Sequence, residues 1–172
     1  MSKGIIILLN GVSSSGKTTL ARALQDKASE HYWYLSNDNF ASVCSAKFIE
    51  ENRPEAINQT MFLMGNTIKV FSDLQKNVVV DTLILSQSRY KMYSELLSDY
   101  PLCMVHVSCP IDELRKREEQ RGDRIIGTAE NQLPDLWVQE PYDVILDTFM
   151  LTTDECVKII FDFIVDKLHS RA

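Results

Sequence analysis

Near its N-terminus the chain reads Gly11-Val12-Ser13-Ser14-Ser15-Gly16-Lys17-Thr18, which fits the phosphate-binding pattern G-x-x-x-x-G-K-[ST] at every fixed position. Glycines let such a loop wrap closely around phosphates, while its amide N–H groups and the next helix N-terminus supply partial positive charge. Lys17 then reaches the β- and γ-phosphates of a nucleotide, and the Thr18 hydroxyl holds Mg²⁺. The motif therefore predicts a nucleotide site that extends from residue 11 to Thr19.

The sequence on both sides of this loop has the periodicity that the motif requires. Residues 5–9 form a short apolar run, mostly β-branched, which is typical of a strand buried on both faces. After the loop, Leu20, Ala21, Leu24 and Ala28 recur three or four residues apart, the spacing of one helix face. A strand, a phosphate loop and a helix in this order indicate a true motif rather than a chance match.

Composition limits the class of protein. The 172 residues are 45% hydrophobic and 24% charged, which favours a single globular domain. A net charge of −6 argues against a nucleic-acid partner. The four cysteines form no C-x-x-C pair, so we expect reduced thiols rather than a zinc site. Since no apolar run is long enough for a signal peptide or a membrane span, we expect a cytoplasmic protein with no membrane partner. Nothing in the sequence indicates the oligomeric state.

Strand and helix patterns alternate along the whole chain. Further strands are expected at residues 32–36, 78–81, 102–108 and 142–146. Helices are expected over residues 54–71 and 88–98, after Pro110, and after the capping-box sequence of residues 152–155. This order predicts an α/β fold with three layers, in which helices cover both faces of a five-stranded parallel sheet. We expect residues 1–172 to form one P-loop NTPase domain of the nucleotide-kinase type.

Three aspartates fall at the ends of predicted strands. Parallel strands bring their carboxyl ends to one edge of the sheet, so Asp38, Asp81 and Asp147 should gather near the phosphate loop. Asp38 is our candidate for the catalytic base that accepts the proton of an acceptor hydroxyl; the alternative is a helix N-cap. Asp81 is a candidate Mg²⁺ ligand through water, as in Walker B arrangements, and the alternative is a residue of the turn that ends the strand.

A charged segment follows the fourth predicted strand. Arg117, Arg121 and Arg124 are four and three residues apart, so they share one face of a helix. Gly122 and Asp123 interrupt that helix, and we expect a lid over about residues 117–138 whose arginines close over the phosphates. The alternative is a solvated charge run, in which the arginines pair with neighbouring carboxylates. Those carboxylates are Glu118, Glu119 and Asp123.

With these residues in view, the chain resembles the chloramphenicol phosphotransferase-like P-loop kinases over nearly its whole length. Residues 10–17 are similar to the family's N-G-x-S-S-x-G-K loop, and residues 117–124, with Gly127, resemble its R-E-x-x-R-G-D-R lid. Residues 142–148 are similar to its Y-D-V-x-x-D-T segment, and Glu155-Cys156 to the E-C pair on its last helix.

The resemblance implies ATP as donor, Mg²⁺ as cofactor, and transfer of the γ-phosphate to a hydroxyl of a small molecule. The expected acceptor is a chloramphenicol-like antibiotic or a related metabolite, and whether the protein confers antibiotic resistance is not indicated by the sequence. Asp38 falls at the family's catalytic carboxylate, and Arg121 and Arg124 fall on its lid arginines, so we expect these residues and Lys17 to act in the transfer. Arg117, earlier in the lid, is expected to contact the nucleotide. One departure concerns Asp81, which is followed by Thr82 where the family has a second aspartate.

The acceptor is the open part of this interpretation. Residues 39–75 and 83–100 carry no family signature, although they should build the acceptor pocket. A nucleoside, nucleotide or sugar kinase on the same scaffold is therefore an alternative. A regulatory nucleotide-binding module is disfavoured, since the sequence lacks N-K-x-D and the D-x-x-G that would follow the phosphate loop. The acidic balance disfavours a nucleic-acid end kinase.

Overall fold

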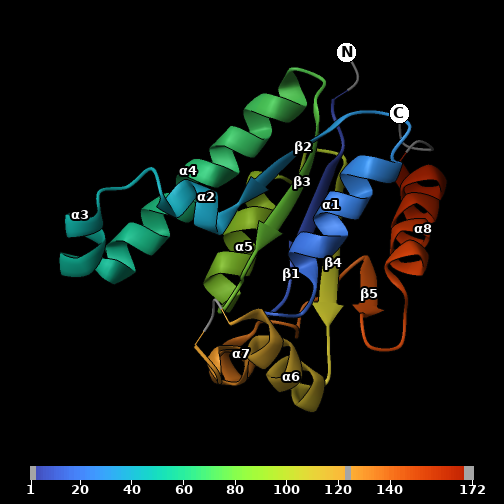
Figure 1. Ribbon diagram of the computed structural model, residues 1–172. Coiled ribbons are helices and arrows are strands. Elements are labelled where there is room, and N and C mark those ends of the chain that lie inside the picture. The colour runs from blue at the N-terminus through green and yellow to red at the C-terminus, as the bar shows by residue number, and fades with distance from the viewer. Residues whose placement is uncertain (1–2, 123–124, 169–172) are drawn as a thin grey trace.

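The computed structural model of the protein describes residues 3–122 and 125–168, with strands and helices alternating along the chain (Figure 1). In the first half the elements are β1 (Ile6–Asn10), α1 (Lys17–Lys27), β2 (Tyr32–Ser36), α2 (Asn37–Ala41), α3 (Ala46–Glu51), α4 (Arg53–Asp73) and β3 (Asn77–Thr82). In the second half they are α5 (Gln87–Leu96), β4 (Leu102–Ser108), α6 (Ile111–Arg121), α7 (Thr128–Gln132), the 3₁₀ turn η1 (Leu133–Asp135), β5 (Val144–Asp147), α8 (Thr153–Phe163) and the π-helical turn η2 (Ile164–Leu168).

The strands form one parallel sheet in the order β2-β3-β1-β4-β5, with β1 at its centre. Ile7 pairs with Val79 of β3 on one side and with Cys103 of β4 on the other. Every residue of β1 is buried, including the polar Asn10 at its end, and the apolar run before Asn10 agrees with burial on both faces. The phosphate loop therefore leaves the sheet from the middle of its carboxyl edge.

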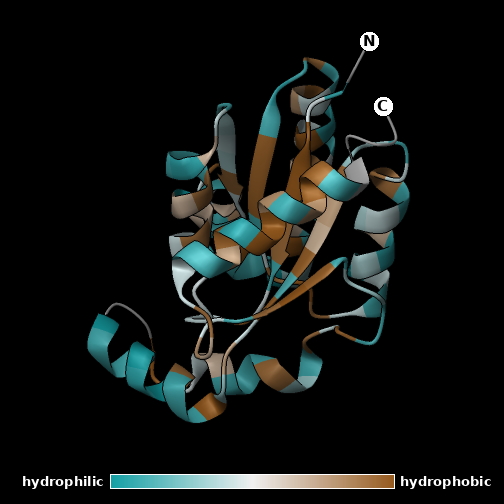
Figure 2. Cartoon of the chain, turned by 90° about the vertical axis from the view of Figure 1, so that its right-hand side faces the viewer, coloured by the Kyte–Doolittle hydropathy of each residue, from teal (hydrophilic) through white to brown (hydrophobic). Residues whose placement is uncertain are grey.

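Alternate residues of β1 support two hydrophobic cores. Ile7 and Leu9 face the core that contains α1 and α8, while Ile6 and Leu8 face the core beneath α4 and α5. Figure 2 shows the hydrophobic strands between helices whose outer sides are largely hydrophilic. The predicted three-layer α/β fold is confirmed.

Helix α6, α7 and η1 lie beyond the carboxyl ends of the strands, below the arrowheads in Figure 1. A third and smaller core, which includes Val12, Leu114 and Ala129, packs them against the phosphate loop. Gly122 ends α6 in the left-handed region (φ 66°), as its glycine predicts. This layer covers the edge of the sheet at which the predicted site residues gather.

The structure departs from the sequence-based expectations mainly at short elements. Residues 37–41 form helix α2 directly after β2, and α3 was not expected at all. Strand β5 begins at Val144 rather than at residue 142, because the Asp143 carboxylate, not a backbone carbonyl, accepts from the Met104 amide (2.8 Å). None of the described helices combines the length and the apolar character that a membrane crossing needs.

Candidate active site

The phosphate loop is packed against the neighbouring strand by its first glycine. A Cβ atom at Gly11 would overlap the carbonyl oxygen of Val107, so only glycine fits there. Ser14 (φ 60°) and Gly16 (φ 97°) both have left-handed backbone conformations, of the kind found in backbone nests that bind anions. The loop is thus a narrow cradle fixed to β4.

Two buried hydroxyls in this cradle lack partners. Ser14 is 9% exposed and Ser15 is fully buried, and neither side-chain oxygen has a hydrogen-bond partner among the described residues. Buried hydroxyls are normally hydrogen-bonded, because losing water without replacement is costly. Lys17, which is also buried, donates to the carbonyl of Val12 (2.9 Å). The cradle therefore has donors suited to oxyanions such as phosphates.

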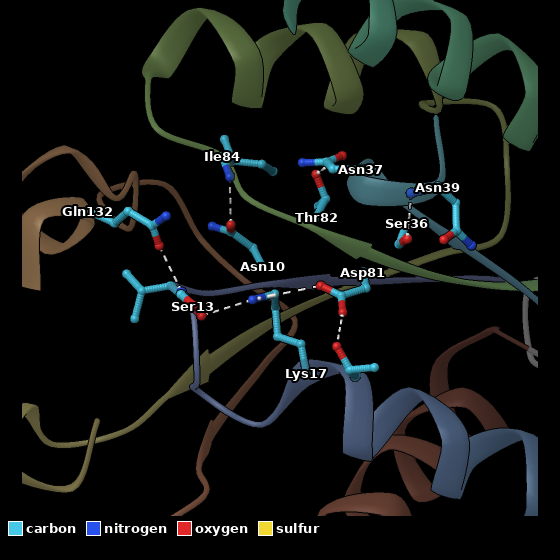
Figure 3. A network of polar contacts seen from close by, with 12 residues as sticks. Asn10, Ser13, Lys17, Ser36, Asn37, Asn39, Asp81, Thr82, Ile84 and Gln132 are labelled. Carbon is cyan, nitrogen blue, oxygen red and sulfur yellow. Dashed lines mark hydrogen bonds and ion pairs between the residues drawn. The ribbon is translucent and has the colours of Figure 1, made fainter. Parts of the chain in front are cut away.

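Asp81 of β3 lies opposite the loop (Figure 3). Its Oδ2 accepts from the Thr18 hydroxyl (2.6 Å) and from the Tyr34 hydroxyl (3.4 Å), while its Oδ1 lies 3.7 Å from Lys17 Nζ. Burial, and then the charge of Asp81, raise the pKa of Tyr34, whose protonated hydroxyl is the donor in this contact. Asp81 is thus held inside a strand by the phosphate loop and does not belong to a turn.

The described residues contain no cluster of three or more His, Cys, Asp or Glu that could hold a metal ion alone. A hydroxyl paired with a single carboxylate, as in Thr18 and Asp81, instead fits Mg²⁺ that is also bound to nucleotide phosphates.

Two cavities meet at the loop. The first, of about 380 Å³, lies between the loop, α6 and the beginning of α8. The second, of about 370 Å³, lies between the loop and the carboxyl ends of β2 and β3. Both are lined by Ser14, Lys17, Thr18 and Arg121. A molecule bound in the first cavity can therefore extend along the loop into the second.

Asp38 lies in the first turn of α2 and lines the second cavity together with Asp81. The alternative that Asp38 caps a helix is wrong, because Ser36 is the N-cap of α2 and accepts from the backbone N–H of Asn39 (3.1 Å). Asp147 differs from both: its carboxylate accepts from the backbone N–H of Phe149 (2.9 Å), and it lines neither cavity. Of the three predicted strand-end aspartates, Asp38 and Asp81 therefore lie together at the second cavity, and Asp147 does not.

The lid segment brings two of its three arginines to these cavities. Arg117 lines the first cavity and donates to Glu113 and to the hydroxyl and carbonyl oxygens of Thr148 (3.0–3.1 Å). Arg121, at the end of α6, lines both cavities. Arg124 lies outside the described residues.

The alternative of a solvated charge run fails for Glu118. This side chain is fully buried, and its carboxylate accepts from the backbone N–H groups of Gly127 (2.8 Å) and Ala129 (2.7 Å). Glu119, beside it, is exposed. Glu118 thus joins α6 to α7.

Three further polar residues support the site, and no role was predicted for them. Asn10 is fully buried; it accepts from the backbone N–H of Ile84 (2.8 Å) and donates to the Tyr142 hydroxyl (2.6 Å). Gln132 accepts from the backbone N–H of Ser13 (2.7 Å; Figure 3), and Thr148 donates to the carbonyl of Ser15 (2.8 Å). Asn10 and Thr148 fall within sequence segments resembling family motifs; Gln132 carries no such signal.

A family model described as chloramphenicol phosphotransferase-like protein matches residues 4–165. A protein of Halalkalibacterium halodurans named probable adenylyl-sulfate kinase is 29% identical over 176 residues, covering 94% of this chain and 83% of that protein. Among solved structures, a gluconokinase from Sinorhizobium meliloti matches with a TM-score of 0.73 at 17% identity, covering 98% of this chain and 95% of that chain. The Mycobacterium tuberculosis APS kinase, solved with AMPPNP and APS, matches with a TM-score of 0.71 at 14% identity, covering 95% of this chain and 99% of that one.

Proposed function

This chain belongs to the chloramphenicol phosphotransferase-like family of kinase-like P-loop phosphotransferases, and from that premise we propose that it transfers the γ-phosphate of ATP to a hydroxyl group of a small molecule. The observation that carries the proposal is the second cavity, in which Lys17 and Thr18 line one side and Asp38 lines another. Phosphoryl transfer needs a phosphate cradle and a group that accepts the hydroxyl proton, arranged around one space. This cavity offers both.

In this proposal the loop and its neighbours bind the triphosphate. The loop amides and the Ser14 and Ser15 hydroxyls contact phosphate oxygens, Lys17 reaches the β- and γ-phosphates, and Thr18 and Asp81 would hold Mg²⁺. When bound, Mg²⁺ supplies positive charge that offsets the negative charge of the phosphates.

Asp38 acts on the acceptor. Its carboxylate orients the hydroxyl and takes its proton as the acceptor oxygen forms a bond to the γ-phosphorus and the bond to the ADP oxygen breaks. Arg121 reaches both cavities and stabilises the charge that develops on the transferred group. Arg117, fixed by Glu113 and Thr148, forms a wall for the nucleotide. We also propose that residues 117–138 act as a lid.

A nucleotide-type acceptor is the second candidate. It is favoured by the relative named as an adenylyl-sulfate kinase, which matches almost the whole chain. An acceptor panel should therefore contain adenylyl sulfate, nucleosides and gluconate beside chloramphenicol and aminoglycosides. Acceptor-stimulated ADP release, with mass spectrometry of the product, separates the two candidates.

The test of the proposal is Asp38→Asn, with Asp147→Asn as the matched control. Asp147 also follows a strand, but it lines neither cavity. We expect Asp38→Asn to lower kcat for the best acceptor at least a hundredfold, within the usual range for loss of a general base, with little change in ATP affinity. Asp147→Asn should keep kcat within a factor of about three.

ATP affinity is measured by calorimetry and turnover by ADP release. Near-normal turnover in Asp38→Asn, or an equal loss in both variants, would refute the role given to Asp38. A wild-type protein that binds no ATP in the presence of Mg²⁺ would refute the whole proposal.

A further inference from the structure

A third cavity, of about 310 Å³, lies beyond Asp38. Its walls come from α2, α3, α4, the segment between β3 and α5, and the first turn of α5. Apart from Asn37 and Asp38, all of its lining residues lie in the two parts of the chain without a family signature. Its lining residues are Asn37, Asp38, Ala41, Ile49, Arg53, Ala56, Ile57, Thr60, Met61, Leu83, Leu85 and Arg89. A cavity of this volume is at the small end of the range for ligand pockets.

This third cavity adjoins the second cavity, in which phosphoryl transfer is proposed to occur. Asn37, Asp38 and Leu83 line both. A molecule in the third cavity can therefore present one end to Asp38, facing the phosphate loop. Its other end then lies toward α4 and α5, where the lining is mainly apolar and includes two arginines.

Most of that lining is apolar, but two arginines interrupt it. Arg53 begins α4, and Arg89 lies in the first turn of α5. Neither guanidinium has a carboxylate partner among the described residues, whereas Arg115 is paired with Glu130 and Arg117 with Glu113. The one carboxylate in the lining is Asp38. Two arginines and one aspartate give this cavity a positive balance within a protein of net charge −6.

We propose that the third cavity binds the acceptor, and that this acceptor is a hydroxyl-bearing anion with a compact apolar body. The inference rests on the proposed function and gives it a substrate class. Arg53 and Arg89 bind the carboxylate, sulfate or phosphate group of the acceptor, and its hydroxyl lies at Asp38. Guanidinium groups suit this task, since their N–H groups donate in pairs to two oxygens of the same anion. A neutral acceptor such as chloramphenicol leaves both arginines without a counter-charge.

The test uses two probes of nearly equal size, 3-hydroxybenzoate and its neutral amide, 3-hydroxybenzamide. The protein is first saturated with AMPPNP and Mg²⁺, so that the phosphate loop does not capture the anion. Binding is followed by NMR of the methyl groups of Ile49, Ile57 and Met61, which line the cavity. We expect 3-hydroxybenzoate to shift these methyl signals at concentrations at least tenfold lower than 3-hydroxybenzamide does. A third probe, 3-hydroxybenzenesulfonate, shows whether the cavity also binds a sulfonate anion.

Substitution of the arginines sharpens the test. Arg53→Gln and Arg89→Gln should each weaken binding of 3-hydroxybenzoate at least fivefold and leave the amide unchanged. Lys91→Gln is the matched control, because it removes one positive charge from an exposed position of α5 outside the cavity. Arg89→Lys, which keeps the charge, should retain part of the affinity even if Arg89→Gln folds poorly.

Equal binding of the benzoate and the amide, no shift of the cavity methyl groups with either anion, or unchanged benzoate affinity in both arginine variants would overturn the inference. Failure of the proposed function looks different. If the third cavity prefers the anion but the protein transfers no phosphate from ATP, the proposed function is refuted and the cavity remains an anion-binding site. If the protein transfers phosphate to a neutral acceptor and the third cavity binds the benzoate and the amide equally, the inference is refuted and the proposed function stands.

Discussion

Glu118 has no exposed surface, although glutamates are rarely buried unless they are bonded. Its two oxygens accept from the backbone N–H groups of Gly127 and Ala129, which bracket the beginning of α7. Both donors would be left buried or poorly paired without this carboxylate. Together with the ion pair between Arg115 and Glu130, this side chain holds α7 against α6.

We expect Glu118→Gln to destabilise the protein by about 1.5–3 kcal/mol, since one charged acceptor is replaced by an N–H₂ group that faces a donor. The exposed neighbour Glu119 provides the control, and Glu119→Gln should stay within about 0.5 kcal/mol of wild type. Urea unfolding measures both, and hydrogen exchange of the Gly127 and Ala129 amides should accelerate only in Glu118→Gln. Equal stability of the two variants would contradict the structural role of Glu118.

Residue roles were predictable where the signal is local in the sequence. Lys17 and Thr18 follow from their places in an eight-residue motif, and the structure brings them to Asp81 at the neighbouring strand end. Gln132 and Thr148 contact the loop from 119 and 133 residues away. No local pattern in the sequence specifies such a distant partner. For the same reason, the burial of Glu118 could not be predicted from the charged segment in which it lies.

At the scale of single elements, α8 begins with a complete capping box. Thr152 accepts from the backbone N–H of Glu155 (3.3 Å), and the Glu155 carboxylate accepts from the backbone N–H and hydroxyl of Thr152 (2.8 Å each). These two hydrogen bonds lower the pKa of Glu155 below its usual 4.5. The carboxylate is thus stabilised in the folded state relative to the unfolded chain.

This shift fixes the sign of a pH dependence. A lowered pKa in the folded state contributes stability that is fully present above the unfolded pKa and is lost as the pH falls through the folded value. Glutamine also fits a capping box, so Glu155→Gln removes mainly the charge. We expect the variant to be less stable than wild type at pH 7 and the difference to shrink below about pH 4.5, as measured by urea unfolding. A difference that does not change with pH would contradict this account.

The strands were the easiest elements to predict. Strands β2 and β4 have the expected bounds, since their β-branched and aromatic runs end at polar residues. Helix α3 was not predicted: it has six residues, none buried, and depends on the Ser45 cap, whose hydroxyl accepts from Phe48. A short helix without a buried face leaves no periodicity in the sequence.

At the scale of the whole molecule, nucleotide binding should stabilise the fold. A ligand that binds only the native state, at a hundred times its Kd, adds about 2.7 kcal/mol. For a chain of this length that corresponds to an increase in Tm of about 5–10 °C. We expect this increase with ATP and Mg²⁺, and we expect Lys17→Ala to remove most of it while keeping the Tm of the nucleotide-free protein within about 3 °C.

Differential scanning calorimetry measures the shift. Lys27→Ala serves as the control, because Lys27 lies in the last turn of the same helix and lines neither of the two cavities at the loop. A Lys17→Ala protein that still shows the full ATP-dependent shift would contradict the assignment of the loop.

The overall architecture could be predicted because alternating strands and helices allow few arrangements. The same rule brought the strand-end aspartates to one edge. The third cavity could not be predicted, since its walls depend on how α2 and α3 pack near α4, and on the position of Leu83 and Leu85 after β3. These contacts join segments that are distant in the sequence, and nothing in either segment predicts that it packs against the other.

The hydrogen bond from Ser13 to Gln132 has a cost for any ligand that enters the loop. One N–H group serves a single strong acceptor, so a phosphate oxygen that takes the Ser13 amide must first expel the glutamine. Because Gln132 ends α7, this hydrogen bond links the loop to α7; a phosphate oxygen that takes the Ser13 amide removes that one link, while Glu118 still holds the beginning of α7. Anion binding in the loop and the contact between the loop and α7 therefore compete for one backbone proton donor.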